Sequence, residues 1–160
     1  MENSANSDTI SHKGRPVEIL LVEDNVGDVI LTKKAFKKAK LPNNITVAED
    51  GDKAIQFLRR DDRGNAPMPD IILLDLNLPK KNGQEVLKEI KSDERLKKIP
   101  VIVLTSSSAE LDVVKSYNLH ANSYLVKPVT LDKFVDIVKT LEEFWFSSAI
   151  LPESVQQGEA

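Results

Sequence analysis

Residues 70–75 read Asp-Ile-Ile-Leu-Leu-Asp, a short apolar run that ends on a carboxylate. Short runs rich in Val, Ile and Leu favour strands that are buried on both faces of a parallel sheet. Three further runs also end at or just before a polar group: Glu-Ile-Leu-Leu-Val (18–22) before Glu23-Asp24, Val-Ile-Val-Leu (101–104) before Thr105, and Ser-Tyr-Leu-Val (123–126) before Lys127. Helical patterns separate the runs, so the sequence predicts an α/β fold.

Five strand–helix units are expected along the chain. We place strands near 17–23, 45–49, 70–75, 100–105 and 122–126, and helices near 26–40, 52–61, 83–92, 108–117 and 131–146. Such alternation indicates a doubly wound five-stranded parallel sheet with helices on both faces. Residues 61–69 contain one glycine and two prolines and are predicted to form a loop. We expect one domain at 17–146, a disordered lead at 1–16 and a C-terminal tail at 147–160.

The polar residues at the strand ends form the candidate site. In an open α/β sheet, ligands bind outside the carboxyl ends of the strands. The fold should therefore bring together three carboxylates, a hydroxyl and an ammonium on one rim: Glu23, Asp24, Asp75, Thr105 and Lys127. Polar residues also end strands simply because loops are hydrated, and for any one of these residues that explanation is equally good. All five at carboxyl ends are much harder to explain that way.

The chemistry of this group suits a divalent metal and a phosphoryl group. Glu23, Asp24 and Asp75 would repel one another without a cation, and hard oxygen ligands favour Mg²⁺. A strand-end carboxylate such as Asp75 can attack phosphorus and become an acyl phosphate. Lys127 would pair with phosphoryl oxygens, and the Thr105 hydroxyl would donate a hydrogen bond to another.

Composition excludes several other functions. The chain has 160 residues, no cysteine, two histidines and a formal net charge of −3. There is no thiol chemistry, no basic footprint for nucleic acid and no apolar run of ~18 residues that could span a membrane. The polar, acidic start does not resemble a signal peptide, so we expect a cytoplasmic protein.

Competing catalytic patterns fit poorly. A dinucleotide or P-loop site needs a glycine-rich turn after the first strand, and here that turn is Glu-Asp-Asn-Val-Gly-Asp. A phosphatase of the haloacid dehalogenase type needs a second Asp two residues after the nucleophile, where this chain has Asn77. The two histidines, His12 and His120, are too far from the strand ends to complete a catalytic triad.

The strand-end motifs together resemble the receiver domain of two-component response regulators. The motifs are Val-Glu-Asp-Asn, Leu-Leu-Asp-Leu-Asn-Leu-Pro followed by Asn-Gly, Leu-Thr-Ser, and Tyr-Leu-Val-Lys-Pro, and they span residues 17–146. The resemblance implies a flavodoxin-like receiver fold in which Asp75 accepts phosphate from a histidine kinase. It also implies that Asp24 and Asp75 hold Mg²⁺, with Glu23 acting through water and Asn77 through its backbone carbonyl.

The resemblance has further implications for signalling. A receiver catalyses only its own phosphorylation and dephosphorylation, so the chain would not be an enzyme acting on external substrates. About 14 residues remain after residue 146, so we expect a stand-alone regulator without an output domain. Phosphorylation would draw in Thr105, and Tyr124 would turn into the vacated space; the alternative role for Tyr124 is a half-buried aromatic on an outer strand. The motif Val-Glu-Asp-Asn-x-x-Asp-x-x-Leu (22–31), the long 61–69 loop and Leu-Asn-Leu-Pro-Lys (76–80) further resemble stand-alone regulators paired with cyanobacterial phytochrome kinases.

The first predicted helix should carry a docking surface. A helical wheel places Leu31, Ala35, Phe36 and Ala39 toward the sheet. It leaves Val26 and Ile30 exposed beside the acidic site, flanked by Lys33 and Lys37. This surface could receive the kinase, or it could be a solvated helix face with incidental apolar residues. Asp28 falls on the buried arc, and the sequence indicates no partner for it.

The last predicted helix has an apolar arc that exceeds half its circumference. Phe144, Trp145 and Phe146 are contiguous, so no single face can bury all three. Either the end of the helix folds back on the body, or this surface meets a second subunit. We expect a homodimer through the last strand, the 131–146 helix and the tail.

Three functions remain to be distinguished. The first is a phospho-accepting switch, and the second is a Mg²⁺-dependent phosphatase acting on external substrates. The third is a receiver-like scaffold without phosphorylation, which the complete set of five site residues disfavours.

Overall fold

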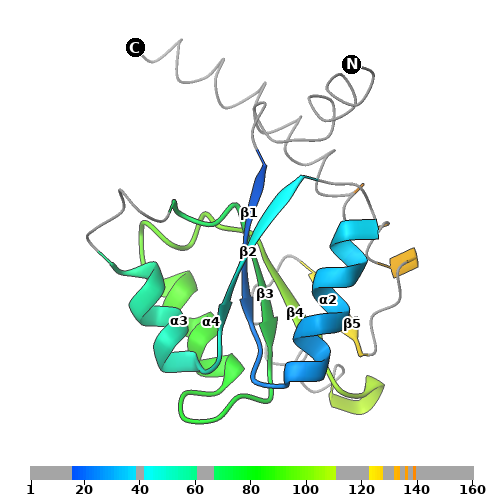
Figure 1. Cartoon of the computed structure of the whole chain (residues 1–160). Coiled ribbons are helices and arrows are strands. Elements are labelled where there is room, and N and C mark those ends of the chain that lie inside the picture. Colours follow the sequence, from blue (N-terminus) through cyan, green and yellow to red (C-terminus); the bar gives the residue numbers. More distant parts are fainter. Residues whose placement is uncertain are drawn as a thin grey trace.

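The computed structural model describes residues 16–38, 42–60, 67–110, 123–127, 132, 133, 136 and 139. Within them, five parallel strands form one sheet in the order β2-β1-β3-β4-β5 (Figure 1). The strands are β1 (Val17–Val22), β2 (Asn43–Ala48), β3 (Ile71–Asp75), β4 (Val101–Thr105) and β5 (Ser123–Val126). All five predicted strands are confirmed, with small shifts at their ends.

Helices cover both faces of the sheet. α3 (Gly51–Leu58) and α4 (Gly83–Ser92) lie on one face, and α2 (Val26–Lys38) lies on the other (Figure 1). The backbone is also helical at 108–110 and at residues 132, 133, 136 and 139. Most of the predicted helices 108–117 and 131–146 lies outside the described residues, as do residues 1–15 and 140–160. None of the helices in the described part of the chain is long and apolar enough to cross a membrane. The cytoplasmic location stays a prediction.

The core consists of two apolar clusters, one on each face of the sheet. Along β1, Leu20 and Val22 join the α3–α4 cluster, while Ile19 and Leu21 join the α2 cluster. Successive side chains of a strand point to opposite faces, so a strand covered on both sides must be apolar throughout. The two central strands β3 and β4 are buried at every position, which explains their unbroken apolar runs.

Close backbone contacts fix the loop that follows β3. A Cβ atom at Gly83 would lie 2.5 Å from the carbonyl oxygen of Asp75, so α4 can begin directly against the end of β3. Asn82 and Glu85 form a capping box at this helix start, in which each side chain accepts a hydrogen bond from the other's backbone N–H. A Cβ at Gly51 would lie 2.0 Å from the carbonyl oxygen of Lys81, so α3 also begins against the loop. The segment that carries Asp75 is therefore anchored on two sides.

The predicted orientation of α2 is correct in part. Ala35 and Phe36 are buried, and Val26 and Ile30 are exposed, as expected. Leu31 was expected to face the sheet, and this is wrong, because its side chain is 58% exposed. Thr32 is buried together with Phe36, so the helix is turned toward these two residues. At 100° per residue, Leu31 lies outside the arc formed by the buried residues Thr32, Ala35 and Phe36. Ala39 lies outside the described residues.

Candidate functional site

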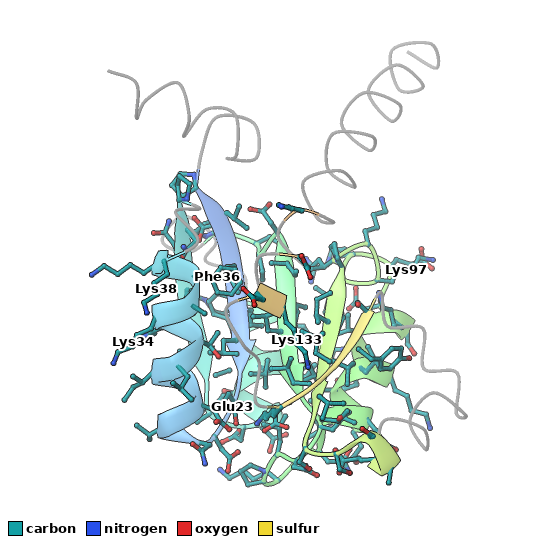
Figure 2. The ribbon with its side chains drawn as sticks, turned by 90° about the vertical axis from the view of Figure 1, so that its right-hand side faces the viewer. Glu23, Lys34, Phe36, Lys38, Lys97 and Lys133 are labelled. Carbon is teal, nitrogen blue, oxygen red and sulfur yellow. The ribbon has the colours of Figure 1, made fainter. Side chains whose placement is uncertain are left out.

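The acidic residues after β1 and at the end of β3 meet at the carboxyl edge of the sheet. Glu23, Asp24 and Asp75 each present an oxygen, and these oxygens all lie within 4.8 Å of one another. Glu23 and Asp75 are buried, at 2% and 3% exposure, whereas Asp24 is exposed. The adjacency of β1 and β3 in the sheet causes this convergence, because parallel strands end on the same edge. Glu23 is visible at this edge in Figure 2.

Lys127 joins the acidic group from the end of β5. Its ammonium lies 2.8 Å from Glu23 Oε1, 3.0 Å from Asp75 Oδ2 and 3.0 Å from Asp28 Oδ2. Its backbone N–H donates to the carbonyl oxygen of Thr105 at 2.7 Å, which extends the β4–β5 pairing to the site. Two of the three carboxylates that contact Lys127, Glu23 and Asp75, were expected from the sequence, and Asp28 was not.

Asp28 is the residue that sequence reasoning left without a partner. It lies in the first turn of α2, and the structure places its carboxylate on Lys127, distant in sequence but adjacent in space. One signal was available in the sequence, since a charged residue on the buried arc of a helix requires a partner of opposite charge. Nothing in the sequence identified which of the many lysines that partner would be.

The surroundings of the site raise the pKa of both Glu23 and Lys127. Burial, followed by the hydrogen bond with Asp75, raises the pKa of Glu23 from 4.5 to about 7, even though Lys127 opposes the shift. Burial by itself would lower the pKa of Lys127, but hydrogen bonds to Glu23, Asp28 and Asp75 hold this pKa above its ordinary value. The site thus keeps a permanent ammonium beside a Glu23 carboxyl group that is partly protonated near neutral pH.

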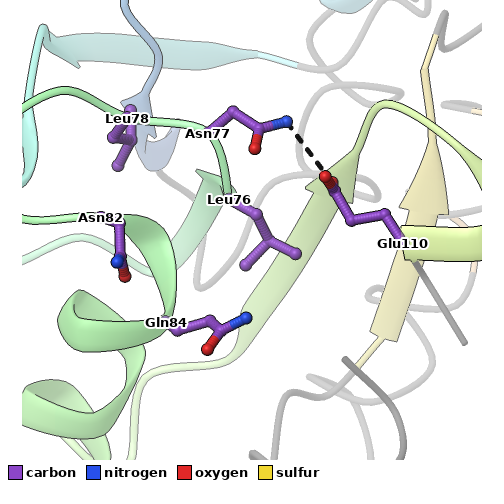
Figure 3. Close-up of a pocket in the computed structure, with 6 residues that line it drawn as sticks. All are labelled: Leu76, Asn77, Leu78, Asn82, Gln84 and Glu110. Atoms are coloured by element: carbon purple, nitrogen blue, oxygen red, sulfur yellow. Dashed lines mark hydrogen bonds between the residues drawn. The ribbon is translucent and has the colours of Figure 1, made fainter. Parts of the chain in front are cut away.

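A pocket of about 400 Å³ opens beside Asp75, between the loop after β3 and the segment after β4. Its lining residues are Leu76, Asn77, Leu78, Asn82, Gln84 and Glu110 (Figure 3). The Asn77 side-chain amide donates to Glu110 Oε1 at 3.4 Å across this pocket and to Ser106 Oγ at 3.0 Å. Glu110 Oε1 also accepts from the backbone N–H of Ser106 at 3.2 Å. Glu110 was not singled out from the sequence, which gives no distance between segments so far apart.

Asn77 and Thr105 differ in their hydrogen bonds: Asn77 binds Asp75, whereas Thr105 does not. The backbone N–H of Asn77 donates to Asp75 Oδ1 at 3.1 Å. Thr105 follows on the neighbouring strand and is fully buried, and its hydroxyl donates to the carbonyl oxygen of Ser107 at 3.1 Å. The Thr105 hydroxyl is therefore engaged within its own loop in this structure.

Tyr124 lies on β5, the strand at the outer edge of the sheet. Its side chain is half-buried and packs against the α3–α4 cluster. The register pairs Tyr124 with Val103, two residues before Thr105 on β4. This position is compatible with either role considered for it from the sequence.

Comparison with known proteins identifies the family. The model of the response regulator receiver domain matches residues 19–139, which is most of the chain. The chain belongs to this family. It is thus a receiver, a signalling module of two-component systems, with the five-stranded doubly wound fold of that family.

Related receivers share nearly the whole of the described domain. The chain is 45% identical to the response regulator Rcp1 of Synechocystis sp. over 138 residues, which cover 86% of this chain and 94% of the relative. The solved structure of the phosphorylated cyanobacterial phytochrome response regulator RcpA is 48% identical, with a TM-score of 0.67 and coverage of 83% and 96% of the two chains. A Mn²⁺-bound form of Rcp1 is 46% identical, with a TM-score of 0.66 and coverage of 81% and 94%.

The acidic group of this receiver fits a divalent cation. Glu23, Asp24 and Asp75 supply only oxygen donors, and burial together with the neighbouring Asp75 carboxylate raises the pKa of Glu23. A cation among them would offset their mutual repulsion. Asp24 is exposed, which leaves one side of the group open to a hydrated ion. The donor set is therefore suited to a hard divalent metal, as expected for receivers.

Proposed function

We propose that this receiver accepts a phosphoryl group on Asp75 from the phosphohistidine of a histidine kinase. The observation that carries the proposal is the position of Asp75, which is buried, has an oxygen within 4.8 Å of oxygens of Glu23 and Asp24, and contacts the Lys127 ammonium at 3.0 Å. A carboxylate that lies next to both a metal-binding group and an ammonium has two positive charges nearby, that of the bound cation and that of the ammonium. Both can stabilise the negative oxygens of a transferring phosphoryl group.

The transfer exchanges one bond for another. The P–N bond to the partner's imidazole breaks, a P–O bond to an Asp75 carboxylate oxygen forms, and the released histidine nitrogen regains its lone pair. Mg²⁺, held by Glu23, Asp24, Asp75 and the Asn77 carbonyl, would neutralise charge on the phosphoryl oxygens. Lys127 would follow the negative charge from Asp75 to a phosphoryl oxygen, which its flexible stem allows.

The proposed response to phosphorylation involves Thr105 and Tyr124. The Thr105 hydroxyl would leave the Ser107 carbonyl, to which it donates now, and donate to the phosphoryl group instead. That movement would draw the segment after β4 toward Asp75 and change the space beside Tyr124. The result is a shift in population between two arrangements of the β4–β5 surface.

The proposed partner is a histidine kinase of the phytochrome type. Support comes from the similarity to RcpA, whose name states that it is a cyanobacterial phytochrome response regulator. The exposed apolar residues Val26 and Ile30 on α2 lie at the same edge as the acidic site and are the proposed docking surface.

The test is mass spectrometry after incubation with Mg²⁺ and acetyl phosphate. We expect the mass to increase by one phosphoryl group in the parent and to stay unchanged in Asp75→Asn, with circular dichroism showing the same fold in both. Equal labelling of Asp75→Asn would assign the phosphate to another residue. Continued turnover of a small phosphate ester beyond one equivalent would instead support the phosphatase alternative.

A further inference from the structure

Lys127 contacts three carboxylates, and only two of them belong to the acidic group that fits a metal. Glu23 and Asp75 are members of that group, and Asp28 is not. Asp28 Oδ2 nevertheless lies as close to the ammonium as Asp75 Oδ2 does, at 3.0 Å. Asp28 is therefore the partner of Lys127 that neither metal binding nor phosphorylation uses.

Asp28 is held firmly by the first turn of α2. Its backbone N–H donates to Asn25 Oδ1 at 2.9 Å, which caps the helix start. Its carbonyl oxygen accepts from the Thr32 hydroxyl at 2.9 Å, and Thr32 is only 7% exposed. The Asp28 side chain is 36% exposed and that of Lys127 is 18% exposed, so the ion pair is partly shielded from solvent.

The other two partners of Lys127 change during the reaction. A metal would take up oxygens of Glu23 and Asp75, and phosphorylation converts the Asp75 carboxylate into an acyl phosphate. The ammonium sits on a stem with four rotatable bonds, so it loses orientation when its anchoring carboxylates are taken. A carboxylate that takes no part in the reaction and is held by its helix reduces the conformational freedom that Lys127 must lose when it binds a phosphoryl oxygen.

We propose that Asp28 is a positioning residue for Lys127, holding the ammonium at the phosphoryl site throughout the transfer. The proposal rests on the phosphorylation of Asp75 proposed above. It also links the site to the proposed docking helix, because Asp28 lies in the same first turn of α2 as Val26, on the side of the helix that faces the site. A partner that moves the start of α2 would act on the phosphoryl-binding lysine through this ion pair.

A purely structural role for Asp28 predicts different behaviour. An acidic residue in the first turn of a helix stabilises that helix through the aligned backbone dipoles. Asp52 also lies in the first turn of its helix, α3, and no contact joins it to Lys127, so it is the control. Asp28→Asn and Asp52→Asn each remove one such charge and keep the side-chain shape.

The first experiment measures the rate of labelling by acetyl phosphate at saturating Mg²⁺ for both variants. We expect the maximal rate of Asp28→Asn to fall about five- to tenfold, because a partly shielded ion pair contributes modestly to the barrier. Asp52→Asn should label like the parent, and Asp28→Glu should recover part of the rate. Equal rates for Asp28→Asn and the parent would overturn the proposal.

The second experiment repeats Asp28→Asn in a Lys127→Met background. If Asp28 acts through Lys127, the substitution has no further effect on the slow residual labelling there. The same cycle on stability in chelator should show coupling between the two residues, which needs no phosphorylation to be measured. Equal slowing in both backgrounds, or no coupling in chelator, would contradict the positioning role. A parent that takes no label at all would instead refute the phosphorylation of Asp75 itself.

Discussion

At the scale of single residues, the site brings together side chains of like charge, which reduces the free energy of unfolding. Glu23, Asp24 and Asp75 converge because their strands are neighbours, and Lys127 compensates only part of their repulsion. Burial, followed by the hydrogen bond with Asp75 and the charge of Asp75, raises the pKa of Glu23. The stability of the protein should therefore depend on Mg²⁺ and on pH.

Mg²⁺ should stabilise the unphosphorylated protein against heat, and Asp24→Ala should abolish the effect. A ligand that binds only the folded state adds about 2.7 kcal/mol to the free energy of unfolding at a hundredfold excess over its dissociation constant. In chelator, Asp24→Ala should be at least as stable as the parent, since it relieves repulsion. Differential scanning calorimetry with Mg²⁺ and with chelator measures both quantities. A lower melting temperature of Asp24→Ala in chelator would show that the acids do not repel.

Glu23 should make the metal-free protein less stable as the pH rises from 5 toward 7. The folded state keeps the Glu23 proton up to about pH 7, whereas an unfolded chain releases it near 4.5. The folded state then binds more protons in this range, so the free energy of unfolding falls with pH, by up to about 1.4 kcal/mol per unit. Urea unfolding of the parent and of Glu23→Gln in chelator measures the difference. Parallel pH profiles for the two proteins would contradict the raised pKa.

At the scale of elements, α2 has the most varied surface. It buries Thr32, Ala35 and Phe36 against the sheet. Figure 2 shows Phe36 on the side toward the sheet, with Lys34 and Lys38 extending outward. Val26, Ile30 and Leu31 remain exposed among these lysines. Exposed apolar residues beside a site are a common mark of partner binding.

Ile30→Glu should slow phosphoryl transfer from the partner kinase and leave labelling by acetyl phosphate unchanged. The substitution places a charge in an apolar contact, which weakens docking by an expected tenfold or about 1.4 kcal/mol. Leu31→Glu is the matched control. Leu31 is also exposed, but it lies about 100° around the helix from Ile30 and outside the surface formed by Val26 and Ile30. Transfer rates measured with the purified kinase distinguish the two positions. A loss of both activities in Ile30→Glu would show that the substitution disturbed the site rather than a docking surface.

The sequence predicted the elements and the convergence of the site better than it predicted side-chain directions. Glu23, Asp24, Asp75 and Lys127 meet because strand order alone determines that edge, and apolar runs reveal the strands. The rotation of α2 depends on how Thr32 and Phe36 pack against the sheet, which a helical wheel does not contain. For this reason, the exposure of Leu31 and the pairing of Asp28 with Lys127 emerged only in three dimensions.

At the scale of the whole molecule, the receiver domain at 17–146 stays a prediction, with the family match at 19–139 inside it. Among the described elements, α2 covers one face of the sheet, and α3 and α4 cover the other (Figure 1). The edge strands differ from the central ones, since no residue of β5 is fully buried. The proposed association through β5 would therefore leave the fully buried central strands β3 and β4 undisturbed.

The chain should form a homodimer through β5, the 131–146 helix and the tail. Phe144, Trp145 and Phe146 lie outside the described residues, and three contiguous large aromatics cannot share one buried helix face. The described positions of that helix are exposed and alternate in charge: Asp132, Lys133, Asp136 and Lys139. In a two-fold contact, acid on one copy can meet base on the other, so the charges set register while the aromatics supply most of the binding energy.

Sedimentation velocity on the full chain measures this association. We expect a dimer at micromolar concentration and a shift toward monomer in the double variant Phe144→Ala with Phe146→Ala, because truncating aromatics removes the largest apolar contacts. The phosphorylated and unphosphorylated proteins should be compared, since a dimer found only with phosphate would link association to Asp75. A monomeric parent in both states would rule out the dimer, and the aromatics would then have to fold back on the body of their own chain.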